Sequence, residues 1–146
     1  MEAATDHITA EEYFAVSREG DRTQLIDGVM VVNEPRFLHA VVQTRLLAAL
    51  VAWTEKGPGR GLAGSPIDVT MSEHDVYGPD VIWYSEERIP TDWEAKHQAM
   101  PDLVAEVRSP GTWRFDIGLE LSAGDTLASP VLPGFALGIE GLFHRS

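Results

Sequence analysis

The sequence contains no cysteine among its 146 residues. A disulfide framework and a thiolate-ligated metal site are therefore both excluded. The chain also shows no repeat, no low-complexity tract and no linker that would divide it. At this length we expect a single domain over residues 1–146, which buries roughly two-thirds of the surface that the unfolded chain exposes.

Basic residues are few, because 11 lysines and arginines stand against 23 aspartates and glutamates, for a net charge of −12. They are scattered along the chain and form no cluster. Tight non-specific binding to nucleic acid requires lysine and arginine to neutralise phosphates, so the composition argues against it. A nuclease is not excluded, since an acidic metal site contributes to such a charge balance.

Long apolar runs are missing as well. The longest candidate, LHAVVQTRLLAALVAW, contains His39, Gln43, Thr44 and Arg45, whereas a membrane span needs about 20 predominantly apolar residues. The first residues, MEAATDHITAEEY, lack the basic-then-apolar pattern of a secretion signal. We therefore expect a cytoplasmic protein with no membrane partner.

The patterns that are present predict a mixed α/β fold, with one mixed sheet flanked by helices. A capping box from Thr9 to Glu12 predicts a short helix that ends near Val16, with Ile8, Tyr13 and Val16 facing inward. The stretch QLIDGVMVV predicts a hairpin with its turn at Asp27-Gly28.

Spacings of three and four residues predict a longer helix from Arg36 to Lys56. Its inward side chains are expected to be Leu38, Val41, Val42, Leu46, Ala49, Leu50 and Trp53. Strands are predicted over residues 62–72 with a bend at 64–66, over 77–84 and over 103–107. A weak helix is expected over 112–121, and short extended pieces are expected in the tail.

Two Pro-Asp dipeptides precede predicted strands, and only one fits a metal site. Asp102 and Glu106 would share one strand, so their α-carbons would lie about 13 Å apart. That separation is too long for ligands that each approach Mg²⁺ within about 2.1 Å. Asp80 begins the preceding strand, and neighbouring strands lie about 4.8 Å apart, so Asp80 and Glu106 can approach one cation. Arg108 would point to the same face as Glu106.

The chain resembles the Uma-type restriction endonucleases of the PD-(D/E)xK, restriction-endonuclease-like superfamily. The resemblance lies in the order of TAEEY, LIDGVMVV, His39, Pro79-Asp80, LVAEVRSPGT, Asp116 and GDTLASPVLPGFAL. It implies a single restriction-endonuclease-like domain that hydrolyses DNA phosphodiesters with Mg²⁺ or Mn²⁺. Asp80 and Glu106 would be catalytic metal ligands, and Arg108 would be the phosphate-facing cation, because its guanidinium cannot act as a base.

The chain departs from this family pattern at three places. Gln24 stands where the family usually has glutamate, and Glu120 stands where it more often has lysine. Leu121 runs directly into Ser122, where relatives have further elements, which implies an internal deletion near the C-terminus. Such a truncated fold would leave the Glu106 strand with an uncovered edge. The endonuclease is thus either active or catalytically impaired.

Two other function classes stay open. A non-catalytic remnant of the fold would act as a protein-interaction module, for example as a homodimer paired through the exposed sheet edge. An acid/base hydrolase would use the two carboxylates without metal. His39 either makes a hydrogen bond typical of a helix start or faces the site, and the former is favoured. Trp93 either anchors its loop or stacks on a base, and the former is again favoured.

Overall fold

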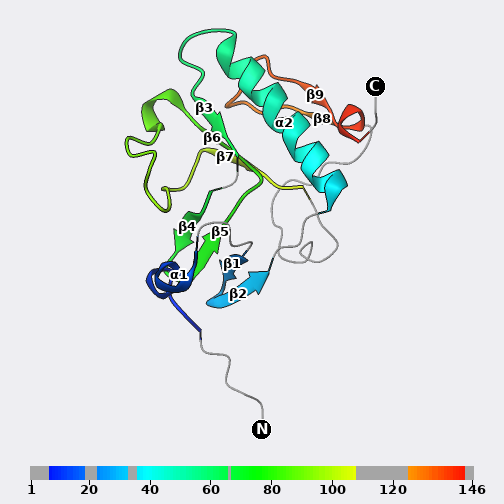
Figure 1. Cartoon of the computed structure of the whole chain (residues 1–146). Helices are drawn as coiled ribbons and strands as arrows, with labels where there is room; N and C mark the ends of the chain where they lie inside the picture. Colours follow the sequence, from blue (N-terminus) through cyan, green and yellow to red (C-terminus); the bar gives the residue numbers. More distant parts are fainter. Residues whose placement is uncertain (1–6, 19–22, 33–35, 66, 108–124, 144–146) are drawn as a thin grey trace.

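The computed structural model describes residues 7–18, 23–32, 36–65, 67–107 and 125–143 (Figure 1). Its α-helices are α1 (Ala10–Val16) and α2 (Phe37–Glu55), and short 3₁₀ helices cover Glu86–Arg88 and Glu140–Leu142. The strands are β1 (Thr23–Ile26), β2 (Val29–Val32), β3 (Leu62–Gly64), β4 (Val69–Ser72), β5 (Asp75–Tyr77), β6 (Val81–Tyr84), β7 (Leu103–Ala105), β8 (Thr126–Leu127) and β9 (Leu137–Gly138). The predicted helix over 112–121 lies outside the described residues.

The mixed α/β class is confirmed, but the described strands form three antiparallel sheets instead of one mixed sheet. Their orders are β2-β1-β5-β4, β3-β6-β7 and β8-β9. The segment predicted as one bent strand over 62–72 divides between two sheets as β3 and β4, and the strand predicted over 77–84 is limited to β6, with Tyr77 ending β5 in the other sheet. In the second segment, Gly78-Pro79-Asp80 interrupts the ladder, because proline has no N–H to donate.

Helix α1 and the β1–β2 hairpin form as the sequence predicts. Thr9 Oγ1 accepts a hydrogen bond from the Glu12 N–H at 3.2 Å, and the Glu12 carboxylate accepts one from the Thr9 N–H at 3.1 Å. The turn residues have φ of 49° at Asp27 and 74° at Gly28, the left-handed conformation that two-residue hairpin turns require.

This half of the molecule has its own small core of Ala10, Tyr13, Leu25 and Val76, with Ile8 and Phe14 packed against it. The prediction that Val16 faces inward is wrong, because its residue is 62% exposed. Phe14 is partly buried instead, since its ring stacks on His97 with centroids 4.3 Å apart. A neighbouring loop, which the helical spacing could not indicate, therefore decides which side of α1 is covered.

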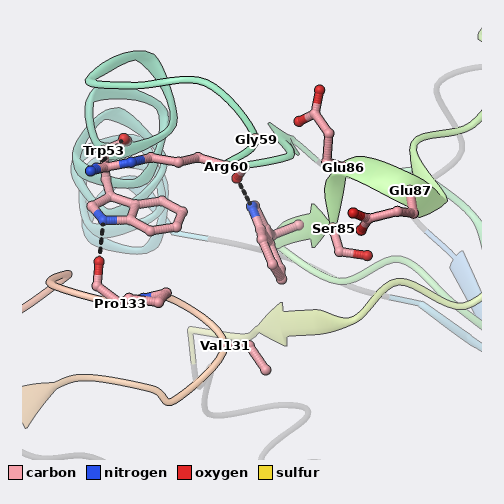
Figure 2. A pocket seen from close by; sticks show the side chains of 9 residues that line it. Trp53, Gly59, Arg60, Ser85, Glu86, Glu87, Val131 and Pro133 are labelled. Atoms are coloured by element: carbon pink, nitrogen blue, oxygen red, sulfur yellow. Dashed lines mark hydrogen bonds between the residues drawn. The ribbon is translucent and has the colours of Figure 1, made fainter.

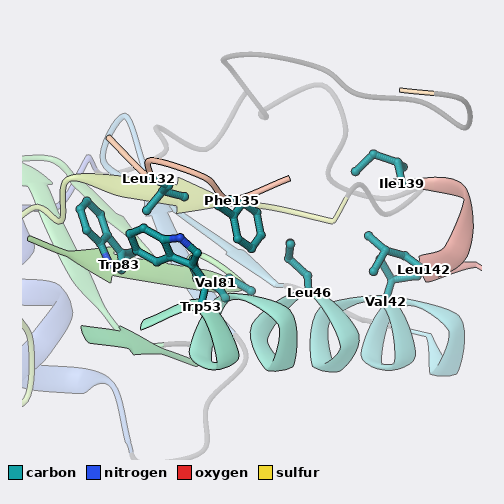
Figure 3. Packing of buried hydrophobic residues seen from close by; sticks show 10 residues of the cluster. Val42, Leu46, Trp53, Val81, Trp83, Leu132, Phe135, Ile139 and Leu142 are labelled. Carbon is teal, nitrogen blue, oxygen red and sulfur yellow. The ribbon is translucent and has the colours of Figure 1, made fainter. Parts of the chain in front are cut away.

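Helix α2 lies over the β3-β6-β7 sheet and builds the main core (Figures 1 and 3). Its buried residues are His39, Val42, Leu46, Leu50 and Trp53. Figure 3 shows Val42, Leu46 and Trp53 opposite β6 and the C-terminal segment, which contributes Leu132, Phe135, Ile139 and Leu142. Leu38 is 54% exposed, so its predicted inward position is wrong. The inward face begins at its neighbour His39 instead.

By length and composition alone, α2 is apolar enough to cross a membrane, a test that core helices also pass. Within its most apolar window, 28% of the residues are buried in this fold. The polar residues within this helix therefore do not by themselves exclude a membrane span. The described contacts instead place one face of α2 in the main core.

Candidate active site

Asp80 lies immediately before β6, with the buried Pro79 ahead of it and only 7% of its own surface exposed. Its carboxylate oxygen Oδ2 is 3.1 Å from His39 Nε2 on α2. The same oxygen accepts a hydrogen bond from the Val107 N–H at 2.6 Å. Gln43 Nε2 donates to the Asp80 backbone carbonyl at 3.0 Å. Asp80 is thus held from both a helix and the neighbouring chain segment.

Glu106 lies opposite Asp80 across the β6–β7 ladder. The last paired residues are Val81 and Ala105, and the next position along each chain is Asp80 and Glu106. Strand β7 ends at Ala105, two residues earlier than predicted, so Glu106 follows the strand and is exposed. Asp80 and Glu106 thus occupy the first positions beyond the paired ladder, where continued pairing would place their Cβ atoms about 5 Å apart.

Tyr77 is a neighbour of this pair that the sequence did not indicate. Burial raises the pKa of its phenol, and the negative charges of Asp75 and then Glu106 raise that pKa further. The charge of Glu106 therefore acts on Tyr77 at the end of β5, although β5 belongs to the β2-β1-β5-β4 sheet. The site lies where the two sheets meet.

Comparisons with known proteins give the chain a family. The model of the Uma2 family, described as "Putative restriction endonuclease", matches residues 10–123 of the chain. The chain belongs to the Uma2 family. The predicted resemblance is thereby confirmed, and the match ends beside the position where the internal deletion is inferred.

A solved structure shares the fold of this Uma2 chain. It is described as a putative nuclease belonging to DUF820, from Anabaena variabilis ATCC 29413. The TM-score is 0.61 at 19% sequence identity, and the match covers 70% of this chain and 59% of that one. No curated protein sequence matches the chain. The family and the fold together indicate a nuclease-like protein, and this chain spans about 59% of the solved neighbour's length.

Gln24, which stands where the family resemblance implies glutamate, contacts the segment just before Asp80. Its Oε1 accepts a hydrogen bond from the Gly78 N–H at 3.1 Å, two residues before Asp80. The Gln24 amide oxygen therefore connects β1 to the segment that precedes Asp80. Arg108, Asp116 and Glu120 lie outside the described residues, so the predicted roles of Arg108 and Glu120 stay predictions.

The other Pro-Asp dipeptide is remote from this site, as expected. Asp102 Oδ2 accepts a hydrogen bond from the Ser85 N–H at 2.8 Å, and Asp102 Oδ1 lies 2.6 Å from Arg88 NH1. These partners belong to the loop that follows β6. Trp93 is 69% exposed, and its indole N–H donates to the Pro90 carbonyl at 2.7 Å, which agrees with a loop anchor.

Asp80 and Glu106 are the candidate ligands for a divalent cation. Two opposed carboxylates suit Mg²⁺, which binds proteins through one or two carboxylates and retains several waters. Within the part of the chain that the structure describes, no three His, Asp or Glu side chains form a group that could hold a metal ion. The described residues therefore offer no cage of protein ligands alone, and a cation held by Asp80 and Glu106 would need water to complete its shell.

A cavity of about 340 Å³ lies at the opposite end of β6. Its lining includes Trp53, Trp83 and Arg60 together with the two glutamates Glu86 and Glu87, and Figure 2 shows Trp53, Arg60 and both glutamates around it. Both indole N–H groups already donate to backbone carbonyls, of Pro133 and Arg60 respectively. The Arg60 guanidinium covers the Trp53 ring with its Cζ 4.9 Å from the centroid. This cavity holds none of the predicted site residues.

Proposed function

We propose that this chain is a cytoplasmic, metal-dependent endonuclease that hydrolyses DNA phosphodiester bonds. The observation that supports it most is the opposition of Asp80 and Glu106 at the end of the β6–β7 ladder. The hydrogen bond from Val107 to the Asp80 carboxylate joins the two chain segments at this point. Family membership and the shared fold support the same reaction class.

In this proposal Asp80 and Glu106 hold Mg²⁺ or Mn²⁺. A bound ion would supply an activated water and stabilise the charge that develops on the phosphate. The chain's own contribution is to present two carboxylates from adjacent strands, with Asp80 oriented by His39 and the Val107 N–H. Arg108, in the third position of the E-x-K frame, would face a phosphate oxygen and donate to it bidentately.

The test is nicking of supercoiled plasmid in the presence of Mg²⁺ or Mn²⁺. We expect Asp80→Asn and Glu106→Gln each to lower the rate by about a hundredfold or more, because loss of a metal ligand exceeds the 10–100-fold effect of losing its outer hydrogen bonds. Asp102→Asn is the matched control, since it alters the other Pro-Asp dipeptide of the same strand pair. Intact plasmid with both ions, together with no calorimetric signal for Mn²⁺ binding, would exclude the proposal.

Addition of EDTA separates this proposal from a metal-free hydrolase. A metal-dependent enzyme loses its nicking activity in EDTA and regains it with excess Mg²⁺. A hydrolase that uses the two carboxylates alone keeps its activity in EDTA, and that result would overturn the metal dependence. The same assay therefore distinguishes the two uses of Asp80 and Glu106.

A second candidate function, a protein-interaction module, is favoured by the open edge of the β3-β6-β7 sheet. Among the described strands, β7 pairs only with β6, and Val104 on β7 is 43% exposed. An unpaired strand edge is a template for another chain, including a second copy. This candidate predicts a concentration-dependent homodimer in sedimentation experiments that Val104→Lys weakens. A monomer at high protein concentration would count against it.

A further inference from the structure

Helix α2 contacts Asp80 twice, through residues one turn apart. His39 and Gln43 are separated by four positions, so their side chains project from the same face of the helix. His39 Nε2 lies 3.1 Å from the Asp80 carboxylate, whereas Gln43 Nε2 donates to the Asp80 carbonyl at 3.0 Å. One contact therefore bears on the side chain of Asp80 and the other on its backbone.

The two nitrogens of the His39 ring have different environments. The residue is only 8% exposed, and Nδ1 is buried with no hydrogen-bond partner among the described residues. Nε2 is therefore the ring nitrogen that contacts Asp80, and this is the polar contact that the described residues give the His39 ring.

Burial of this imidazole has a cost that packing alone does not explain. A polar ring placed in a core leaves unsatisfied hydrogen-bonding capacity, here at Nδ1, and an apolar side chain would avoid that loss. The other buried α2 residues are Val42, Leu46, Leu50 and Trp53, which pack in the main core. His39 differs from them by its contact with a buried carboxylate.

We propose that His39 and Gln43 are positioning residues for Asp80. His39 orients the carboxylate so that Oδ2 also accepts from Val107, and Gln43 fixes the peptide unit before β6. Together they make α2 the element that aims Asp80 at the position opposite Glu106. The inference rests on the proposed function only for what Asp80 then does, because the contacts themselves do not require a metal.

A matched pair of substitutions tests the role of His39. In His39→Gln the amide nitrogen reaches as far as Nε2 and keeps a donor for Asp80, whereas the shorter His39→Asn does not. The readout is hydrogen exchange of the Val107 amide, which donates to the same Oδ2. We expect exchange to accelerate about tenfold in His39→Asn, toward the rate in Asp80→Ala, and to stay near the wild-type rate in His39→Gln.

Two further variants guard against a merely structural effect. Thr44→Ala is the control on the same helix, because its hydroxyl donates to the Ala40 carbonyl of α2 itself. It should leave Val107 exchange unchanged. Gln43→Met keeps the length of the side chain and removes the donor, so it should also accelerate exchange. Wild-type exchange rates in both His39→Asn and Gln43→Met would overturn the inference.

Calorimetry with Mn²⁺ alone links the inference to the proposed function. If both hold, His39→Asn weakens Mn²⁺ binding by about tenfold, the usual effect of losing a hydrogen bond to a metal ligand, and His39→Gln restores most of it. Undiminished Mn²⁺ affinity in His39→Asn would overturn the positioning role. A wild-type protein that binds no Mn²⁺ would refute the metal-dependent nuclease, and Val107 exchange would still decide the inference.

Discussion

The two Pro-Asp dipeptides lie at opposite ends of one pair of strands, and their carboxylates have different surroundings. Asp80 precedes β6 and has a side chain only 10% exposed, against α2 and Val107. Asp102 precedes β7 and has a side chain 24% exposed, with Ser85 and Arg88 as partners. The same dipeptide therefore produces a candidate site at one end and a loop anchor at the other.

The difference shows that location decides the chemistry of a carboxylate. Asp80 has a helix above it and a second carboxylate opposite, whereas Asp102 has a surface arginine and a backbone N–H. Burial makes the hydrogen bonds of Asp80 expensive to lose. Exposure makes those of Asp102 modest contributors, because solvent competes for the same groups.

The largest expected effect is a difference in protein stability between variants of the two aspartates. Asp80→Ala should lower the free energy of unfolding by about 3 kcal/mol, because His39 and the Val107 N–H lose their acceptor in a buried site. Asp102→Ala should cost about 1 kcal/mol, as expected for partly exposed hydrogen bonds. Urea unfolding in EDTA measures both values. Equal losses would mean that the two environments do not differ in the way described.

Lowering the pH should remove the stabilisation that the Asp102 carboxylate contributes. The hydrogen bond from the Ser85 N–H, followed by the contacts with Arg88, holds the pKa of Asp102 below its ordinary value. A folded-state pKa below the unfolded one adds stability above the unfolded pKa, near 3.9, and that stability disappears as the pH falls through the folded pKa. Asp102→Asn should therefore be less stable than the wild type at about pH 6, and the difference should shrink as the pH falls through the folded-state pKa of Asp102.

The comparison uses unfolding curves recorded at several pH values from about 6 downward. Glu94→Gln, on the exposed loop after the 3₁₀ helix Glu86–Arg88, serves as the control for removal of one negative charge. If Asp102→Asn and the wild type differ by the same amount at every pH, the hydrogen bonds to Asp102 do not depend on its charge.

The smallest expected effect concerns Arg88. Its side chain is 47% exposed, with NH1 2.6 Å from Asp102 Oδ1 and NH2 donating to the Met100 carbonyl at 2.7 Å. Arg88→Gln should lower stability by less than about 1 kcal/mol, and added salt should reduce the difference because ions screen exposed pairs. A loss as large as that of Asp80→Ala would show that the exposed end is as tightly organised as the buried one.

Local features were predictable because they depend on neighbours in sequence. The capping box at Thr9 and the Asp27-Gly28 turn formed where expected, since their hydrogen bonds and backbone angles involve residues at most three positions apart. Helix α2 formed within one residue of its predicted ends. Strand geometry alone also separated Asp102 from Glu106, and the two residues flank opposite ends of β7.

Other features depended on contacts between distant segments. Spacing along α1 favoured Val16 as an inward residue, but the loop at His97 covers Phe14. The division of strands among three sheets required knowledge of which ladder each half-strand joins. His39 was expected to make a typical helix-start hydrogen bond, and its contact with Asp80 joins residues 41 positions apart.

The sequence by itself therefore determined the family, the local elements and the choice of Asp80 and Glu106 as candidate ligands. The family follows from the resemblance of the ordered motifs, and the other two follow from strand period and turn chemistry. Only the tertiary structure decided how Asp80 is held, because His39, Gln43 and Val107 reach it from separate parts of the chain. The physical reason is that a buried carboxylate takes its hydrogen bonds from whatever segments the core brings to it.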